Sequence, residues 1–207
     1  MADLERYWDE AKKQRATDQK KSVAKFSDSD WAYVTGVVQK RAGVKESVLR
    51  EDLSDQMNFE FSSGYLYWAM AAWCNIQGYD NLEKFFNKAG DEEFEHANKI
   101  ETYLLDRGYF LEYDPSQGQV INPEKWQSLY EVFSEALDHE RMVTESIKAL
   151  FEEARATGDY QTEEFLHWFL EEQIDEEVKF ETLLKLLEAS GNDEYAINLD
   201  IENLLGE

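Results

Sequence analysis

Proline is nearly absent from this sequence, and its placement limits the chain to one class of fold. The 207 residues contain two prolines, Pro115 and Pro123, which lie close together. They leave residues 51–108 and 124–190 free of proline and dense in helix-forming residues. Proline interrupts a helix because it lacks a backbone donor and clashes with the preceding turn. Two uninterrupted segments of this length therefore predict an all-α protein with long helices.

Each proline-free segment contains one turn signal, at residues 77–80 and at residues 157–159. These turns predict four helices, at about residues 46–76, 80–107, 124–156 and 160–190. Short turns join the first pair and the last pair into antiparallel hairpins, whereas residues 109–123 are long enough to run the length of a bundle. We therefore predict a four-helix bundle with a long crossover between its second and third helices. A short fifth helix is expected between Tyr195 and Leu205.

The N-terminal region differs from the rest of the chain. We assign residues 1–45 to an N-terminal extension and residues 46–207 to the bundle domain. A cap at Ser27–Asp30 predicts a helix that ends near Gly43. The extension carries several aromatic residues, Trp8, Phe26, Trp31 and Tyr33, which argues against a disordered tail. We expect a partly helical extension.

Charge is distributed unevenly between these regions. Residues 1–50 carry 11 Lys and Arg against 8 Asp and Glu, whereas residues 51–207 carry 10 against 37. The opposite charges and the aromatic residues lead to the hypothesis that the extension docks on the surface of its own or a neighbouring subunit. The alternative is a flexible tail.

Acidity and a single cysteine exclude several functions. A net charge of −24 repels nucleic acid and anionic membranes and attracts cations. Cys74 alone cannot form an internal disulfide or a four-cysteine metal site. The sequence has no apolar run long enough for a membrane span, and its acidic start does not resemble a signal or transit peptide. We expect a cytoplasmic protein that binds neither nucleic acid nor membranes.

Polar residues interrupt the apolar stripe of all four predicted helices near the middle of each. In chain order they are Glu60, then Glu93 and His96, then Glu140, and finally Gln173 and Glu176. One such interruption is explained equally well by an ordinary hydrogen-bonded polar residue. Four carboxylates at one level of a bundle would repel one another, and each costs roughly several kcal/mol to bury without compensation. A metal site resolves this conflict.

The residue types point to the metal. Four carboxylates, one imidazole and no thiolate suit iron or manganese better than structural zinc. Glu93 and His96 are three residues apart and share a helix face, as in the Glu-x-x-His element of di-iron bundles. A second copy of this element ends at His167, nine residues before Glu176, and therefore points half a turn away from the site. We interpret His167 and His139 as surface or packing residues.

Four segments resemble the motifs of the non-haem bacterial ferritins, and the resemblance covers about residues 50–206. They are Asn58–Tyr67, Glu92–His96, His139–Glu140 and Trp168–Glu176. The resemblance implies an iron-storage protein with ferroxidase activity, which oxidises Fe(II) to Fe(III) with O2 or peroxide at a di-iron site within each subunit. It also implies a shell of 24 subunits that holds the iron mineral, with the short fifth helix lining a pore.

The resemblance also implies a role for each residue. The first iron would be bound by Glu60, Glu93 and His96, with Glu93 bridging to the second iron. Glu140 and Glu176 would bind the second iron, with Gln173 beside it. A third, more exposed iron site would use Glu92, Glu172 and Asp175, although Asp175 is one methylene shorter than the glutamate usual there. Tyr67 and Trp168 correspond to aromatic residues beside the di-iron centre.

Other functions on the same bundle are a di-iron oxygenase and a passive cation-binding protein. An oxygenase needs a pocket for an organic substrate, and the closely spaced aromatic and leucine positions leave no obvious gap for one. Consumption of O2 on addition of Fe(II) separates a ferroxidase from passive binding, and growth of a mineral separates storage from oxygenation. We do not expect haem, because the bacterioferritin pattern is absent at Gln173 and Glu176 and its haem-binding methionine has no match.

Overall fold

The structure is a computed structural model that describes residues 2–18, 20, 22–23, 26–115 and 120–205. The side chains of residues 2–4, 28–29, 31–33, 35–48, 202 and 204–205 lie outside this description, and those of Trp31 and Tyr33 are among them. The described part of the chain is helical and contains no β-strand. Its elements are α1 (Ala2–Asp18), α2 (Asp28–Gln77), α3 (Asp80–Asp106), the 3-10 helix η2 (Pro123–Lys125), α4 (Leu129–Thr157), α5 (Tyr160–Ala189) and α6 (Glu194–Leu205).

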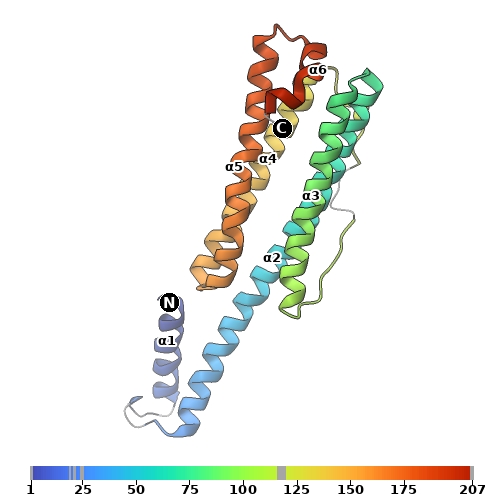
Figure 1. Cartoon of the computed structure of the whole chain (residues 1–207). Coiled ribbons are helices and arrows are strands. Elements are labelled where there is room, and N and C mark those ends of the chain that lie inside the picture. Colours follow the sequence, from blue (N-terminus) through green and yellow to red (C-terminus); the bar gives the residue numbers. More distant parts are fainter. Residues whose placement is uncertain (1, 19, 21, 24–25, 116–119, 206–207) are drawn as a thin grey trace. The chain divides into compact units, whose positions relative to one another are not determined.

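Helices α2, α3, α4 and α5 pack as a four-helix bundle (Figure 1). The turns within the two hairpins contain Gly78 and Gly158, whose φ angles are 79° and 76°. Such left-handed conformations are easiest for glycine and commonly end a helix. The prediction of an all-α four-helix bundle with a short C-terminal helix and a helical N-terminal extension is confirmed.

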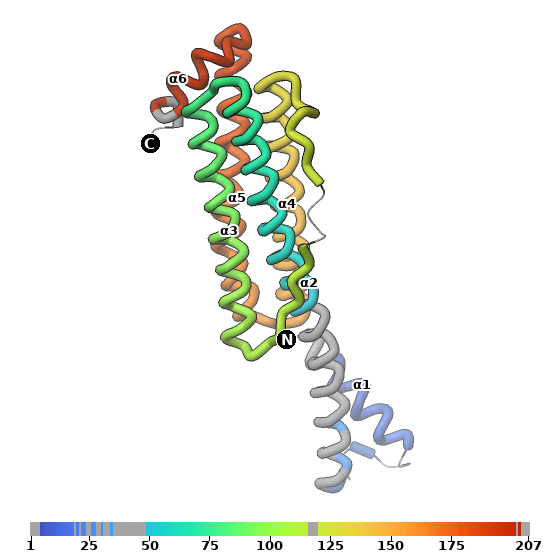
Figure 2. The backbone as a smooth tube through the Cα atoms, turned by 90° about the vertical axis from the view of Figure 1, so that its right-hand side faces the viewer, coloured from blue at the N-terminus to red at the C-terminus, as the bar shows by residue number. Residues whose placement is uncertain are grey.

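A long connection leads from the end of α3 to the start of α4, alongside α2 (Figure 2). Near its start, Asn58 donates to the backbone oxygen of Glu112 at 2.9 Å and accepts from the backbone N–H of Asp114 at 2.9 Å. Near its end, the indole N–H of Trp73 donates to the backbone oxygen of Trp126 at 2.9 Å. The connection therefore contacts α2 at two widely separated points, as the predicted crossover requires.

Two predicted helix boundaries were wrong. Helix α2 continues without a break from Asp28 to Gln77, so no helix ends near Gly43. A glycine inside a helix costs about 1 kcal/mol, which its helix-forming neighbours outweigh, and no proline lies nearby. Helix α4 begins at Leu129 rather than at residue 124, because Pro123 starts η2 and Trp126 is extended, with ψ of 132°.

The chain divides into two compact units, and the first comprises residues 1–52 and 149–167. Within it, the backbone N–H of Ser27 donates to the Asp30 carboxylate at 2.8 Å, which caps the start of α2 as predicted. Arg15 of α1 binds the same carboxylate at 2.8 Å. Ala11 and Val34 are fully buried beside Tyr7, Trp8 and Phe26. The extension thus has a small core of its own, while its docking on the bundle and its boundary at residue 45 stay predictions.

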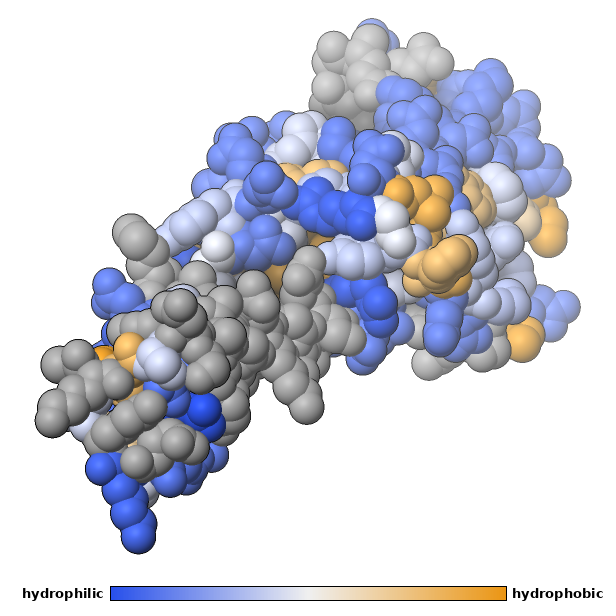
Figure 3. All heavy atoms as spheres, turned by 90° about the horizontal axis from the view of Figure 1, so that it is seen from below, coloured by the Kyte–Doolittle hydropathy of each residue, from blue (hydrophilic) through white to orange (hydrophobic). Residues whose placement is uncertain are grey.

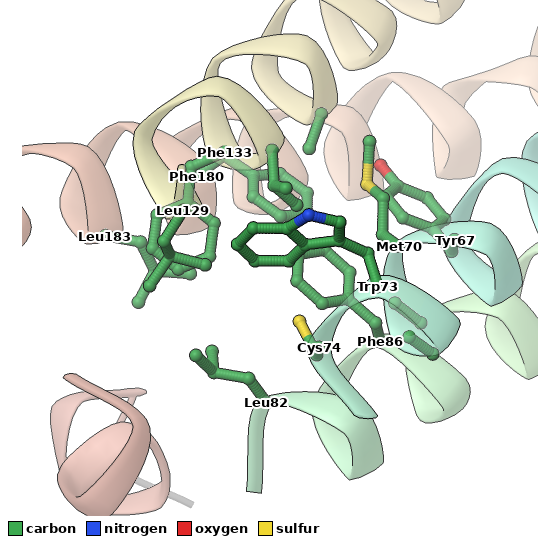
Figure 4. Close-up of a cluster of buried hydrophobic side chains, with 14 of the residues drawn as sticks. Tyr67, Met70, Trp73, Cys74, Leu82, Phe86, Leu129, Phe133, Phe180 and Leu183 are labelled. Atoms are coloured by element: carbon green, nitrogen blue, oxygen red, sulfur yellow. The ribbon is translucent and has the colours of Figure 1, made fainter. Parts of the chain in front are cut away.

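The second unit, residues 53–148 and 168–207, contains the main apolar core. Trp73, Phe86, Phe133 and Phe180 pack together there, and Tyr67 lies at one side of the cluster (Figure 4). Helix α6 covers this end of the core with Ile197 and Ile201. Large apolar side chains thus fill one end of the unit. Tyr67 lies between this cluster and buried polar residues such as Glu140.

Helices α2 and α3 approach each other closely at Gly64 and Gly90. A Cβ on Gly64 would lie 3.1 Å from the backbone oxygen of Gly90, and a Cβ on Gly90 would lie 3.1 Å from that of Gly64. A Cβ on Gly90 would also lie 2.5 Å from the ring of Trp68. Two glycines inside helices, which are unfavourable for each helix alone, are thereby explained by the backbone contact they permit.

Hydrophilic side chains dominate the face shown in Figure 3, where apolar residues form small separate patches. None of the helices in the described part of the chain is long and apolar enough to cross a membrane. Many of the acidic residues are exposed at the surface, and the buried ones need a different explanation.

Candidate metal centre

Glu60, Glu93 and His96 form a compact buried group in the second unit. One potential ligand atom from each residue lies within 4.8 Å of the others, and His96 Nδ1 is 3.5 Å from Glu93 Oε2. The i, i+3 spacing on α3 places Glu93 and His96 on one face, and α2 supplies Glu60. In the described residues this is the one group of three or more His, Cys, Asp or Glu side chains with such geometry.

Two carboxylate oxygens of this group have no hydrogen-bond partner. Glu60 Oε2 and Glu93 Oε2 are buried and accept no hydrogen bond. The other oxygen of Glu60 accepts a 2.8 Å hydrogen bond from Gln56 Nε2, and Gln56 accepts in turn from the hydroxyl of Ser146. Buried polar atoms are almost always hydrogen-bonded, so two unpartnered oxygens in one cluster fit a cation that both would bind.

Glu140 of α4 lies on the other side of the centre and is completely buried. Tyr67 donates its hydroxyl hydrogen to Glu140 Oε1, and Gln173 Nε2 donates to Glu140 Oε2 at 2.9 Å. The Tyr67 ring is held by stacking on Phe180, with ring centroids 5.8 Å apart and planes inclined by 9°. Two neutral donors therefore orient Glu140 without contributing a positive charge.

Burial and mutual repulsion raise the pKa values of these carboxylates together. Burial raises the pKa of Glu60 well above its usual value, and the charge of Glu93 raises it further. Burial and the charge of Glu140 likewise raise the pKa of Glu93. Burial and the charge of Glu176 raise the pKa of Glu140 to about 7, and burial and Glu140 raise that of Tyr67. Without a metal, these groups favour their protonated forms.

Glu176 of α5 differs from the other buried carboxylates because it has a cationic partner. Lys179 Nζ lies 2.7 Å and 2.9 Å from its two oxygens. Burial lowers the pKa of Lys179, but the negative charge of Glu176 and the hydrogen bond to it outweigh burial and hold the pKa above its usual value. Lys179 is therefore a charged ammonium at the edge of the centre.

An open groove of about 510 Å³ lies outside the buried group and reaches His96. Glu92 and Glu172 line it, as does Trp168, whose ring lies 5.5 Å from that of His96 in a T-shaped arrangement. Lys99 Nζ lies 3.8 Å above the centre of the Trp168 ring. Two residues of the predicted third site, Glu92 and Glu172, thus line the same groove as His96.

Asp175, His167 and His139 are not part of the compact group of Glu60, Glu93 and His96. Asp175 is exposed and does not line the groove. His167 is exposed and packs on Phe151 with ring centroids 5.1 Å apart, as expected for a surface residue. His139 is buried and bonded to the Ser63 hydroxyl at 2.7 Å, consistent with packing.

The sequence pattern did not reveal the residues that support the candidate ligands. Lys179 was detectable, because Glu176-x-x-Lys179 places opposite charges on one helix face. Gln56 and Ser146 gave no such signal, because they are 90 residues apart in the sequence and meet only in the folded bundle.

A protein-family model described as the ferritin-like domain of ferritin matches residues 50–190. The matched segment is more than half of the chain and includes every residue of the centre described above. The chain belongs to the ferritin family. The buried group of Glu60, Glu93 and His96 lies within its ferritin-like domain.

Individual relatives agree with this assignment. The ferritin-family chain is 39% identical over 151 residues to a bacterial non-heme ferritin of Staphylococcus aureus (strain MRSA252), covering 73% of this chain and 89% of that protein. It is 38% identical over 141 residues to a bacterial non-heme ferritin of Staphylococcus epidermidis, covering 68% and 83%. An open pore ferritin from the hyperthermophilic archaeon Archaeoglobus fulgidus superimposes with a TM-score of 0.69 at 29% identity, covering 77% of this chain and 95% of that one.

Proposed function

We propose that this ferritin stores iron and has ferroxidase activity, oxidising Fe(II) to Fe(III) with O2 or peroxide at a di-iron site within each subunit. The observation that carries the proposal is the buried group of Glu60, Glu93 and His96, in which two carboxylate oxygens have no hydrogen-bond partner. Carboxylate oxygens with one imidazole suit iron. Iron here is the substrate and the stored cargo.

The first Fe(II) binds to Glu60, Glu93 and His96, and the second binds to Glu140 and Glu176, with Gln173 beside it and Glu93 between the two. Anionic oxygens stabilise a trivalent ion more than a divalent one, since the attraction scales with charge. The ligand set therefore favours loss of an electron. Two adjacent Fe(II) ions together supply the two electrons, and water the two protons, that convert one O2 to hydrogen peroxide.

The protein's own groups also handle protons. Because burial holds the pKa of Glu140 at about 7, a fraction of this carboxyl is protonated at neutral pH before iron binds. A metal ligand must be deprotonated, so iron binding releases protons from this side of the centre. The Tyr67 hydroxyl donates a hydrogen bond to Glu140 Oε1 and so positions that carboxylate for the second iron.

Iron would reach the centre through the groove lined by Glu92, Glu172 and Trp168, where acidic side chains concentrate cations. Glu92 and Glu172, with Asp175 nearby on α5, form the proposed third site. Ferritins assemble as oligomeric shells, and we propose a shell of 24 subunits for this chain. We also propose a cytoplasmic location.

Addition of Fe(II) to the metal-free protein, with O2 uptake and Fe(III) absorbance recorded together, tests this function. We expect rapid oxidation of about two Fe(II) per chain, followed by growth of an electron-dense mineral inside the particle at higher iron loads. Oxidation without a mineral would favour the oxygenase alternative, and binding without O2 uptake would favour a passive cation-binding bundle.

Two histidine variants provide matched arms of this experiment. His96→Ala removes the imidazole of the buried group, and we expect it to abolish the rapid phase. His167→Ala removes the histidine of the second Glu-x-x-His element, which is exposed, and we expect wild-type rates. Equal rates in wild type and His96→Ala would exclude the proposed site.

A further inference from the structure

A lysine ammonium lies among the carboxylates of the proposed second iron site. Lys179 is on α5, one turn after Glu176, and 19% of its side chain is exposed. Its Nζ contacts both oxygens of Glu176, at 2.7 Å and 2.9 Å, and lies 3.9 Å from Glu92 Oε2. It also lies close enough to Glu93 and Glu140 for electrostatic interaction with both.

The two halves of the centre therefore differ before any iron binds. Glu60 and Glu93 each present a buried oxygen without a hydrogen-bond partner, so a first metal ion displaces no ammonium group from those oxygens. Both oxygens of Glu176 are already hydrogen-bonded to a cation. A metal ion at Glu176 would use the same lone pairs as the ammonium, and two cations at that distance repel each other.

We propose that Lys179 is a tethered counter-cation that occupies Glu176 in the metal-free protein and must be displaced by the second iron. The two irons consequently bind in order, first to Glu60, Glu93 and His96, and then to the side of Glu176. This inference rests on the proposed function, because it assigns Glu176 to the second iron. Lys179 is a positioning residue in this scheme and does not contact the reacting atoms.

The displaced ammonium has a second partner within reach. Glu92 Oε2 lies 3.9 Å from Nζ, on the wall of the groove that leads to His96. A small rotation of the long lysine side chain toward Glu92 would keep the ammonium paired while it releases Glu176. Because buried charges without partners are costly, this alternative partner is what allows the exchange.

A purely structural ion pair is the competing explanation, and the chain contains one for comparison. Lys148 Nζ lies 2.8 Å from Glu145 on α4, with the same three-residue spacing, but 55% and 75% of their side chains are exposed. The corresponding values for Lys179 and Glu176 are 19% and 7%. Exposed pairs contribute little to stability. Lys148 is therefore the matched control for Lys179, because its ion pair has the same spacing but involves no residue of the proposed metal centre.

Anaerobic titration with Co(II), which O2 does not consume, tests the order of binding. The metal-free wild type, Lys179→Met, Lys179→Arg and Lys148→Met would be titrated by calorimetry and by the visible spectrum of bound Co(II). We expect two unequal sites per chain in the wild type, and a second site at least about tenfold tighter in Lys179→Met, from the strength of a charged hydrogen bond. Lys179→Arg and Lys148→Met should resemble the wild type.

Thermal unfolding of the same samples separates competition from simple stabilisation. Lys179→Met should unfold at a lower temperature than wild type when metal-free, because Glu176 has lost its cation, and this deficit should disappear with two Co(II) bound. A lysine with a purely structural role would lower both temperatures equally. That result, or a second-site affinity within about twofold of wild type, would overturn the proposal. Absence of Fe(II) oxidation by the wild type would instead refute ferroxidase activity and leave the Co(II) result standing.

Discussion

Replacement of Glu140 by glutamine should change how the stability of the metal-free protein depends on pH. Glu140 is fully buried, and burial together with Glu176 raises its pKa to about 7, compared with a usual value of about 4.5. A raised carboxyl pKa contributes stability that is present below the unfolded-state value and is lost as pH rises through the folded-state value. The wild type should therefore lose stability from this group between about pH 4.5 and pH 7.

The magnitude follows from the same two values. Each pKa unit corresponds to about 1.4 kcal/mol, and the linkage relation gives a loss of about 2.5 kcal/mol between about pH 5 and about pH 8. A glutamine cannot ionise and still accepts from the Tyr67 hydroxyl. We expect the free energy of unfolding of Glu140→Gln, relative to wild type, to increase by about this amount over that range.

Urea unfolding in the presence of a chelator, at one protein concentration and followed by circular dichroism, measures this difference. Titrating groups whose pKa does not depend on Glu140, including His139, whose pKa burial lowers to about 4, are present in both proteins and cancel in the comparison. Glu145→Gln replaces an exposed carboxylate on the same helix and should show no such trend. A stability difference between Glu140→Gln and wild type that is the same at both pH values would refute the reasoning.

Three further outcomes are expected. Glu93→Gln should abolish rapid Fe(II) oxidation in a stopped-flow assay while raising the unfolding midpoint of the metal-free protein, because glutamine is neutral at every pH, whereas burial and the charge of Glu140 oppose ionisation of Glu93; wild-type rates would contradict this. Light scattering should give a particle of roughly half a megadalton, from 24 chains of 24.3 kDa, and a stable monomer or dimer would contradict the storage function. Asp30→Ala should speed protease cleavage within residues 1–27, because Asp30 binds both Ser27 and Arg15 at a cost of about 1–3 kcal/mol when lost, and unchanged cleavage would show that this pairing does not hold the extension together.

Much of the fold was predictable because glycines and apolar stripes mark it. Helix α3 was predicted at residues 80–107 and spans Asp80–Asp106, and α5 was predicted at 160–190 and spans Tyr160–Ala189. Both begin just after glycines with positive φ, Gly78 and Gly158. The starts of α2 and α4 were less predictable, because a glycine is tolerated within a long helix and the short segment after Pro123 forms a different helix type.

The centre was predictable to the extent that its residues interrupt apolar stripes. Glu60, Glu93 and His96 were expected together, and the structure brings them within 4.8 Å; that they bind iron stays a prediction. The groups that hold them could not be read from the pattern, because a supporting side chain such as Gln56 follows no periodicity of its own. Only the packing of helices distant in sequence brings Gln56 to Ser146.

The contact between Gly64 and Gly90 has a consequence for the size of ion that the centre accepts. Glu60 lies one turn before Gly64 on α2, and Glu93 lies one turn after Gly90 on α3, so the two proposed ligands lie next to the point where the backbones meet. A side chain at either glycine would meet a backbone oxygen at 3.1 Å and would push the helices, and with them the two carboxylates, apart. The separation of the backbones that carry Glu60 and Glu93 is therefore set by main-chain contact between the two helices. Alanine at these positions should shift the preference of the centre from small divalent ions toward larger ones such as Ca²⁺, whose bonds to oxygen are longer.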